Sequence, residues 1–217
     1  MYNYQYVTKD EAKPVKEELT IIIHKVQDLL RDEFTFRYDF IGSSSRNMIT
    51  CDPDSNIGFD FDVNIEVNDN DEQYSAKEIK EKLMNAFNRV VSYYGYKSCE
   101  NSTRVFTFKF VEHAFSRIHH SCDVAIVYNY INQKGEPHQQ YIRYIKKQNS
   151  YVWVEQKKPY ALEEKVDWIK KQAKAWGDVI DLYIEKKNNN TNPANHSRSL
   201  YAETIHEICQ RYGYYNN

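Results

Sequence analysis

The stretch FIGSSSRNMITCDPDSNIGFDFDVNIEV, from Phe40 to Val67, bears on both the fold and the function of this chain. It contains a Gly-Ser corner at Gly42–Ser43, entered from an apolar run, and two aspartates, Asp60 and Asp62, one residue apart. From Phe59 to Val67 apolar and polar residues alternate, which predicts a strand with one buried face. The two carboxylates therefore point to the same side of the strand and repel each other unless a cation lies between them.

Periodicity on either side of this stretch predicts a mixture of helices and strands. Helices are expected over residues 12–31, 75–94, 159–187 and 199–211, strands over residues 34–42, 59–67, 104–111 and 122–131, and a hairpin over residues 139–156. A short helix with serine at its start is expected over residues 43–49, and Pro159 is expected to open the long helix. This order predicts an α+β fold with a helical C-terminal tail.

Composition restricts the class of protein. The chain has 217 residues, of which 41% are apolar and 28% charged, and its formal net charge is −2. No apolar run is long enough to span a bilayer, and the first residues lack the features of a secretory signal, so we expect no membrane partner. The four cysteines are far apart and form no C-x-x-C pair. We therefore expect reduced thiols in a cytoplasmic protein.

The paired aspartates point to a site for a divalent cation. Hard carboxylate oxygens bind magnesium, which keeps several waters and completes its shell with substrate phosphates. A site that binds a nucleoside triphosphate through two metal ions needs about three carboxylates. Asp123 fits as the third, because it lies in an apolar strand that otherwise has little use for a charge. We expect Mg²⁺ as the cofactor, with Mn²⁺ as a substitute.

The Gly-Ser corner offers donors for the phosphates of such a substrate. Gly42 lets the backbone turn tightly and approach a ligand. Ser43, Ser44 and the amides that open the following helix can donate to phosphate oxygens. Arg46, one turn further along, can reach the same anion with a charged donor.

Together these residues resemble the nucleotidyltransferase superfamily of polymerase beta. Gly-Ser follows an apolar strand, Asp-x-Asp lies on the next strand, and a single aspartate lies on a later one, over about residues 34–131. The resemblance implies a mixed sheet flanked by helices. It also implies that Ser43 binds the triphosphate, that Asp60 and Asp62 bind both metals, and that Asp123 binds the catalytic metal and helps activate the acceptor. The spacer of sixteen residues between Ser43 and Asp60, with Arg46 in it, resembles the cyclase and polymerase branches.

The function that this resemblance implies is transfer of a nucleoside monophosphate from a triphosphate to a hydroxyl, with release of pyrophosphate. The acceptor hydroxyl can belong to a small molecule, a protein or a nucleotide. Residues 1–158 are expected to form the catalytic core, and residues 159–217 a helical extension packed on it. Two alternatives stay open: a nucleotide-binding scaffold or regulator without turnover, and a structural protein whose strand has an acidic outer face.

Three weaker patterns have simpler explanations. His119 and His120 lie near Asp123, as zinc ligands do, but neighbouring residues point apart, and surface or turn histidines are favoured. Cys122 is expected to be a buried thiol. The stretch YIRYIKKQNSYVWVEQKK interleaves aromatic and basic residues, as single-strand nucleic-acid binders do, but a plain hairpin is favoured. In that stretch Tyr141, Tyr144 and Trp153 are candidates for stacking on a nucleobase.

Overall fold

The computed structural model describes residues 2–55, 58–69, 72–112, 117–156, 161–192 and 194–216. The chain divides into two compact units. The sheet unit comprises Val7–Cys51 and Ser55–Gln156, and the helical unit comprises Met1–Tyr6, Asp52–Asp54 and Lys157–Asn217. A boundary at residue 158 stays a prediction, because residues 157–160 lie outside the described residues. Within the described parts of the chain, every helix is too short or too polar to cross a membrane.

The sheet unit is built on a mixed sheet, which the described residues form from seven strands. These are β2 (Thr35–Ile41), β4 (Phe59–Asn68), β5 (Glu100–Asn101), β6 (Val105–Glu112), β7 (Arg117–Ile131), β8 (Pro137–Ile145) and β9 (Ser150–Glu155). The order is β2-β4-β7-β6-β5, and β8 pairs with both β7 and β9. β4 and β7 run parallel, whereas β2–β4, β6–β7, β7–β8 and β8–β9 are antiparallel. The short segment β3 (Thr50–Cys51) also belongs to this unit.

Two amphipathic helices, α1 (Lys9–Leu30) and α3 (Ala76–Val91), have well-defined starts. Thr8 caps α1 and Ser75 caps α3, and each is part of a capping box with a glutamate three residues later. The 3₁₀ turn η1 (Ser92–Tyr94) follows α3 and ends at Gly95, which adopts the left-handed conformation. These bounds agree with the helices that the apolar spacing predicts over residues 12–31 and 75–94.

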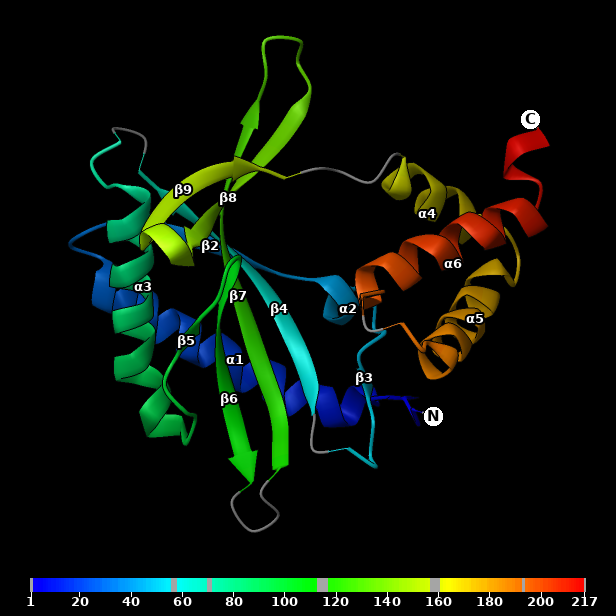
Figure 1. The fold of residues 1–217 in the computed structure, drawn as a ribbon, viewed down its shortest axis with the longest axis horizontal. Coiled ribbons are helices and arrows are strands. Elements are labelled where there is room, and N and C mark those ends of the chain that lie inside the picture. Colours follow the sequence, from blue (N-terminus) through cyan, green and yellow to red (C-terminus); the bar gives the residue numbers. More distant parts are fainter. Residues whose placement is uncertain are drawn as a thin grey trace. The chain divides into compact units, whose positions relative to one another are not determined.

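One face of the sheet packs against both helices and forms the core. Along β4 the apolar residues are buried while the polar residues between them are half-buried or exposed. Phe87 of α3 lies 5.2 Å from Phe106 of β6 between ring centroids. Figure 1 shows α1 crossing behind the strands. The core includes Leu19, Ile22, Val26, Phe61, Val63, Ile65, Leu83, Phe87, Phe106, Phe108, Val124 and Ile126. The acidic residues of β4 therefore lie on the face opposite these two helices.

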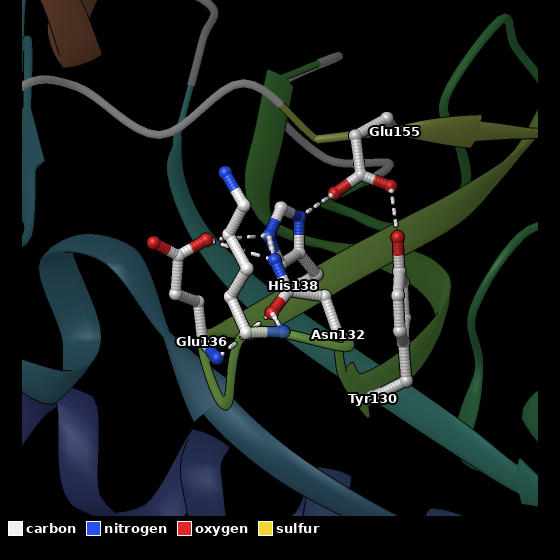
Figure 2. A network of polar contacts seen from close by, with 6 residues as sticks. Tyr130, Asn132, Glu136, His138 and Glu155 are labelled. Atoms are coloured by element: carbon white, nitrogen blue, oxygen red, sulfur yellow. Dashed lines mark hydrogen bonds and ion pairs between the residues drawn. The ribbon is translucent and has the colours of Figure 1, made fainter.

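The hairpin β8–β9 forms where the sequence predicts one, around the 3₁₀ turn η2 (Lys146–Gln148) and Asn149. A polar network holds the preceding turn between β7 and β8 (Figure 2). His138 Nδ1 lies 2.7 Å from Glu155 Oε1, and the Tyr130 hydroxyl donates to Glu155 Oε2 at 3.0 Å. Asn132 Nδ2 donates to Glu136 Oε2 at 2.8 Å. Polar contacts therefore cross from β7 to β8 and β9 beyond the end of the apolar core.

The helical unit contains β1 (Gln5–Tyr6), α4 (Leu162–Lys170), α5 (Ala175–Asn189), α6 (Ser197–Arg211) and the 3₁₀ turn η3 (Tyr214–Asn216). The prediction of one helix over residues 159–187 is wrong, because the helix is interrupted between α4 and α5. The amide of Gln172 donates to the Ile169 carbonyl at 2.9 Å, and Lys174 has φ 66°. Apolar residues continue at helical spacing through the break, which hides it from periodicity. Pro159, the predicted start, lies outside the described residues.

Candidate active site

The register of two parallel strands brings the predicted carboxylates to one face of the sheet. Asp62 of β4 is paired with Asp123 of β7, and Asp60 is paired with Ser121. Side chains at paired positions of neighbouring strands point to the same side. Asp60 is exposed, while Asp62 and Asp123 are half-buried. The structure thus brings together the three aspartates that the sequence singles out, although their role as ligands stays a prediction.

The Gly-Ser corner lies directly against the middle carboxylate. Ile41, the last residue of β2, is paired with Asp62, so the chain turns at Gly42 beside that side chain. Gly42 has φ 67°, and a Cβ atom built on it would lie 2.3 Å from Asp62 Oδ2. A side chain at position 42 therefore requires both a strained backbone and a displaced carboxylate. Position 42 therefore requires glycine because of the positive φ and the contact with Asp62, and the sequence pattern alone does not show that contact.

The helix after this corner is shorter than predicted. It is the single turn α2 (Gly42–Ser45), and no side chain caps it. The prediction of a serine-capped helix over residues 43–49 is wrong, because the Ser44 hydroxyl donates back to the Ile41 carbonyl at 2.8 Å and the Ser45 hydroxyl to the Gly42 carbonyl at 3.0 Å. Local bonds of this kind compete with extension of a helix.

The donors predicted to bind phosphate differ in their surroundings. Ser44 is buried, and its hydroxyl is used inside the turn. Ser43 is half-buried, and in the described part of the chain its hydroxyl has no hydrogen-bond partner. Arg46 is close enough to Asp62 for its positive charge to lower the pKa of that carboxyl group. The binding roles of Gly42, Ser43, Ser44 and Arg46 stay predictions.

Burial and mutual repulsion perturb the carboxyl groups. Burial raises the pKa of Asp62 from 3.8 to about 6, and the charges of Asp123 and Asp60 add to the increase. Burial also raises the pKa of Asp123, while a hydrogen bond from Thr107 and the charge of Lys109 oppose this. Carboxylates that repel one another in a half-buried site are stabilised by a cation placed among them. The electrostatics of the face therefore favour binding of a positive charge.

Two hydroxyl groups that the sequence pattern does not indicate donate hydrogen bonds to Asp60 and Asp123, which are called the outer carboxylates because they flank Asp62. Thr107 of β6 donates to Asp123 Oδ1 at 2.5 Å, and Ser121 of β7 donates to Asp60 Oδ1. Thr107 is paired with Asp123 across β6 and β7. The signal that marks Thr107 is the alternation VFTFKFV, in which Thr107 and Lys109 share the face opposite the phenylalanines. Without a strand pairing, that pattern gives no reason to connect Thr107 with Asp123.

The chemistry of the three carboxylates fits a hard divalent cation. Their oxygens are the ligand type that Mg²⁺ and Mn²⁺ prefer, and one side of each outer carboxylate is held by a hydroxyl. Across the described residues, however, no three or more His, Cys, Asp or Glu side chains are already gathered closely enough to hold a metal ion. The donor set matches a hard divalent cation in its chemistry, and its role as a metal site stays a prediction.

The interpretation of His119 and His120 as surface or turn histidines is wrong for His120, which is buried, whereas His119 is half-buried and lies in a strand, not in a turn. Both belong to β7, and His120 is buried against Phe110, whose ring lies parallel to it with centroids 5.3 Å apart. His120 Nε2 lies 2.7 Å from the Tyr96 hydroxyl, which donates to Glu18 Oε1 at 2.7 Å. Burial lowers the pKa of His120 to about 4. The ring is therefore neutral near pH 7, and its role is to pack within the core.

Cys122 is a buried free thiol, as predicted, and burial raises its pKa well above the usual value.

The aromatic residues of the hairpin pack against other residues of the protein. Trp153 and Tyr151 pack against the core, and Tyr144 stacks on Tyr151 with centroids 4.7 Å apart. Tyr141 is buried beneath Arg104, whose guanidinium carbon lies 4.8 Å from the ring centroid. These contacts favour the plain hairpin over a platform for nucleobases.

Comparison with known proteins gives a likeness in structure alone. No protein-family model matches the sequence, and no curated protein matches it. The STING-associated CdnE c-di-GMP synthase of Capnocytophaga granulosa matches with a TM-score of 0.61 at 16% identity, over 96% of this chain and 63% of that one. The cyclic AMP-GMP synthase DncV of Vibrio cholerae matches with a TM-score of 0.62 at 12% identity, over 93% of this chain and 68% of that one.

A second structure of Vibrio cholerae DncV, in complex with the linear intermediate 5′ pppA(3′,5′)pG, matches with a TM-score of 0.61 at 12% identity. The chain thus spans about two thirds of the length of these synthases. At such low identity the likeness concerns the fold. It confirms the prediction of an α+β fold with a mixed sheet flanked by helices, which this chain shares with these synthases.

Proposed function

We propose that this chain is a nucleotidyltransferase, which moves a nucleoside monophosphate from a nucleoside triphosphate to a hydroxyl group and releases pyrophosphate. The observation that carries the proposal is the pairing of Asp62 with Asp123 in the register of β4 and β7, with Asp60 on the same face. A purely structural role does not explain why three aspartates share one face of the sheet where burial and repulsion raise the pKa of Asp62. Their arrangement on this fold supports a catalytic role.

In this proposal the Gly-Ser corner binds the phosphates. The Ser43 hydroxyl, which has no partner among the described residues, donates to a phosphate oxygen together with nearby backbone amides. Gly42 allows the phosphate and Asp62 to approach the same turn, since a side chain there would occupy the position of the carboxylate. The single turn of α2 is too short for its helix dipole to attract the phosphates strongly, so binding depends on the individual hydrogen bonds from these donors.

Asp60, Asp62 and Asp123 are the residues that would hold Mg²⁺ or Mn²⁺. When bound, the cation would neutralise the phosphates and the charge that develops during transfer. The residues of the chain contribute orientation: Ser121 fixes Asp60, Thr107 fixes Asp123, and the corner at Gly42 confines Asp62. Fixed donors and acceptors lower the barrier because they need no reorganisation during the reaction.

We propose that the acceptor is the ribose hydroxyl of a second nucleotide. The support is the fold, which this chain shares with synthases of cyclic dinucleotides. The acceptor oxygen forms a bond to the α-phosphorus, the bond from the α-phosphorus to the bridging oxygen of the leaving group breaks, and pyrophosphate departs. Asp123 accepts the proton of the hydroxyl, and a carboxyl group whose pKa is raised by burial suits that task.

One observation favours a second candidate, a nucleotide-binding scaffold or regulator without turnover. The described residues contain no group of three His, Cys, Asp or Glu side chains that is already gathered to hold a metal ion. A chain that retains the corner and the carboxylates without ever drawing them together would bind a triphosphate but would not transfer it. Turnover therefore separates the two candidates.

The test is incubation of the full chain with each of the four nucleoside triphosphates, singly and in pairs, with Mg²⁺ or Mn²⁺. Released pyrophosphate is measured, and the nucleotide product is identified by mass. We expect pyrophosphate together with a product that contains a new phosphodiester, and a loss of at least about 100-fold in Asp123→Asn. Binding of triphosphate without pyrophosphate release would favour the scaffold, and absence of both would reject both candidates.

A further inference from the structure

A row of three polar side chains crosses the sheet at the candidate site. Asp62 on β4 is paired with Asp123 on β7, and Asp123 is paired with Thr107 on β6. Paired positions share a face, so all three side chains point away from the core. Thr107 donates its hydroxyl to Asp123 Oδ1 at 2.5 Å, a length within the range for a hydroxyl that donates to a carboxylate.

This hydrogen bond fixes the orientation of the Asp123 carboxylate group. Thr107 lies on the side of Asp123 away from Asp62, because β7 runs between β6 and β4. With Oδ1 bound to Thr107, the other carboxylate oxygen is left for a partner on the remaining side. Threonine is branched at Cβ and has restricted rotation about χ1 in a strand, so its hydroxyl is held at low entropic cost.

A similar hydrogen bond occurs two residues along β4 and β7, at the next pair of positions on the same face. Ser121 of β7 is paired with Asp60 of β4 and donates to Asp60 Oδ1. Ser121 is buried, so its hydroxyl bonds to the carboxylate with little competition from water. Each outer carboxylate therefore has a hydroxyl from a neighbouring strand, whereas Asp62 lies against the turn at Gly42.

We propose that Thr107 is a positioning residue of this site, which holds Asp123 in the orientation that a divalent cation requires, with Ser121 acting likewise on Asp60. The inference rests on the proposed function in its cation site, but it does not require turnover. Groups that orient metal ligands through hydrogen bonds commonly change metal affinity by about 10- to 100-fold when they are removed. A residue that served only the fold would change stability and leave the affinity for the cation unaltered.

The chain offers a matched control on the same sheet. Thr35 is at the start of β2, paired with Asn68, and its hydroxyl accepts a long hydrogen bond of 3.4 Å from Asn68 Nδ2. It is exposed and lies at the end of the strand away from the corner at Gly42. Thr35→Val therefore makes the same chemical change, hydroxyl to methyl, in a strand of the same sheet without touching a carboxylate.

The test measures the dissociation constant of Mn²⁺ for the full chain without nucleotide, by electron paramagnetic resonance of free Mn²⁺. Thr107→Val removes the donor, Thr107→Ser retains it, and Thr35→Val is the control. We expect roughly 10-fold weaker binding for Thr107→Val, and values within about twofold of wild type for the other two variants. Melting curves in chelator show whether each variant is folded, and Ser121→Ala replaces Thr107→Val if the latter does not fold.

The outcomes distinguish this inference from the proposed function. Wild-type Mn²⁺ affinity in Thr107→Val, or equal weakening in Thr107→Ser and Thr107→Val, would overturn the positioning role. Absence of Mn²⁺ binding in the wild type would also overturn it, because no cation site would exist. Weaker binding in Thr107→Val alone would support it, even if the wild type released no pyrophosphate and the proposed function failed. Where turnover occurs, we expect kcat of Thr107→Val to fall about 10-fold with little change in the KM for triphosphate.

Discussion

Asp62 and Asp123 occupy paired positions on two parallel strands, β4 and β7, so their side chains share one face of the sheet although sixty residues separate them. In the sequence neither residue indicates the other. The register places them together, and burial with mutual repulsion raises the pKa of Asp62 to about 6. In the proposed function, a cation bound among the carboxylates would offset this repulsion.

The first prediction concerns Gly42. Gly42→Ala places a Cβ atom 2.3 Å from Asp62 Oδ2 at a residue whose φ is 67°, so the backbone is strained and the carboxylate must move. We expect a loss of about 2 kcal/mol or more in the free energy of unfolding, since a left-handed conformation alone costs an L-residue about 1–2 kcal/mol. The measurement is urea unfolding, with metal binding measured in parallel.

Gly135 provides the control for this prediction. It has φ 79°, but a Cβ atom there would meet nothing within 4 Å. Gly135→Ala should therefore show the backbone strain without the displacement of Asp62, and it should bind Mg²⁺ as the wild type does. Equal Mg²⁺ binding by both variants would contradict the contact between Gly42 and Asp62 as a feature of the site.

The second prediction concerns Ser43. Ser43→Ala should weaken the binding of a nucleoside triphosphate by roughly 10- to 100-fold, because a hydrogen bond to a charged group contributes about 1.5–3 kcal/mol. Its melting temperature should stay near that of the wild type. Ser45→Ala is the matched change in the same turn, where the hydroxyl donates to the Gly42 carbonyl. Calorimetric titration with triphosphate that gave the same affinity for wild type and Ser43→Ala would count against the corner as the phosphate site.

The third prediction concerns acid sensitivity through His120. Its pKa is lowered to about 4 in the folded chain and is about 6.5 in the unfolded chain, so the unfolded state binds more protons between these values. Stability due to the neutral ring is complete above about pH 6.5 and is lost as the pH falls toward 4. The loss approaches about 3 kcal/mol at most. His120→Asn should flatten this part of the curve of unfolding free energy against pH, and an unchanged slope would refute the assignment.

The fourth prediction concerns Asp62, whose effect has the opposite sign. Its pKa is raised from 3.8 to about 6 in the folded chain, so folding is favoured when the carboxyl group is protonated. In chelator the destabilisation should be absent below about pH 4, should grow as the pH rises, and should be complete above about pH 6, reaching about 2–3 kcal/mol. Asp62→Asn should remove it, so wild type and mutant should differ most at pH 7. A constant difference from pH 4 to 7 would contradict the raised pKa.

Much of the fold follows from local patterns. The alternation of β4 predicts its two faces, and the apolar spacing predicts helices that overlap α1 and α3. Such features depend on residues within a few positions of one another, which is why sequence reasoning finds them. The break between α4 and α5 is different, because the apolar spacing continues while Lys174 turns the backbone to φ 66°. Nothing local in the sequence requires a lysine to adopt that conformation.

In the candidate site, too, residues that depend on local sequence are predictable, whereas residues that depend on strand pairing are not. Asp60 and Asp62 are predictable as a pair because they are neighbours on one strand. Asp123 is identified from its charge in an apolar strand and from resemblance to a known pattern. Thr107 and Ser121 cannot be found this way, because their importance arises from the register of β6, β7 and β4. The burial of His120 is hidden from the sequence for a similar reason, since its partner Tyr96 is distant in the sequence.

The measurement that tests the central claim most directly is a set of melting curves for wild type and Asp62→Asn at pH 7, each with Mg²⁺ and with chelator. If the three carboxylates form one cation site, Mg²⁺ should raise the melting temperature of the wild type, because the unfolded chain has no such site. Asp62→Asn should melt at or above the wild type in chelator and should respond much less to Mg²⁺, since an amide is a poorer ligand for a hard cation. Equal Mg²⁺ shifts in the two proteins would contradict the claim that Asp62 holds the metal.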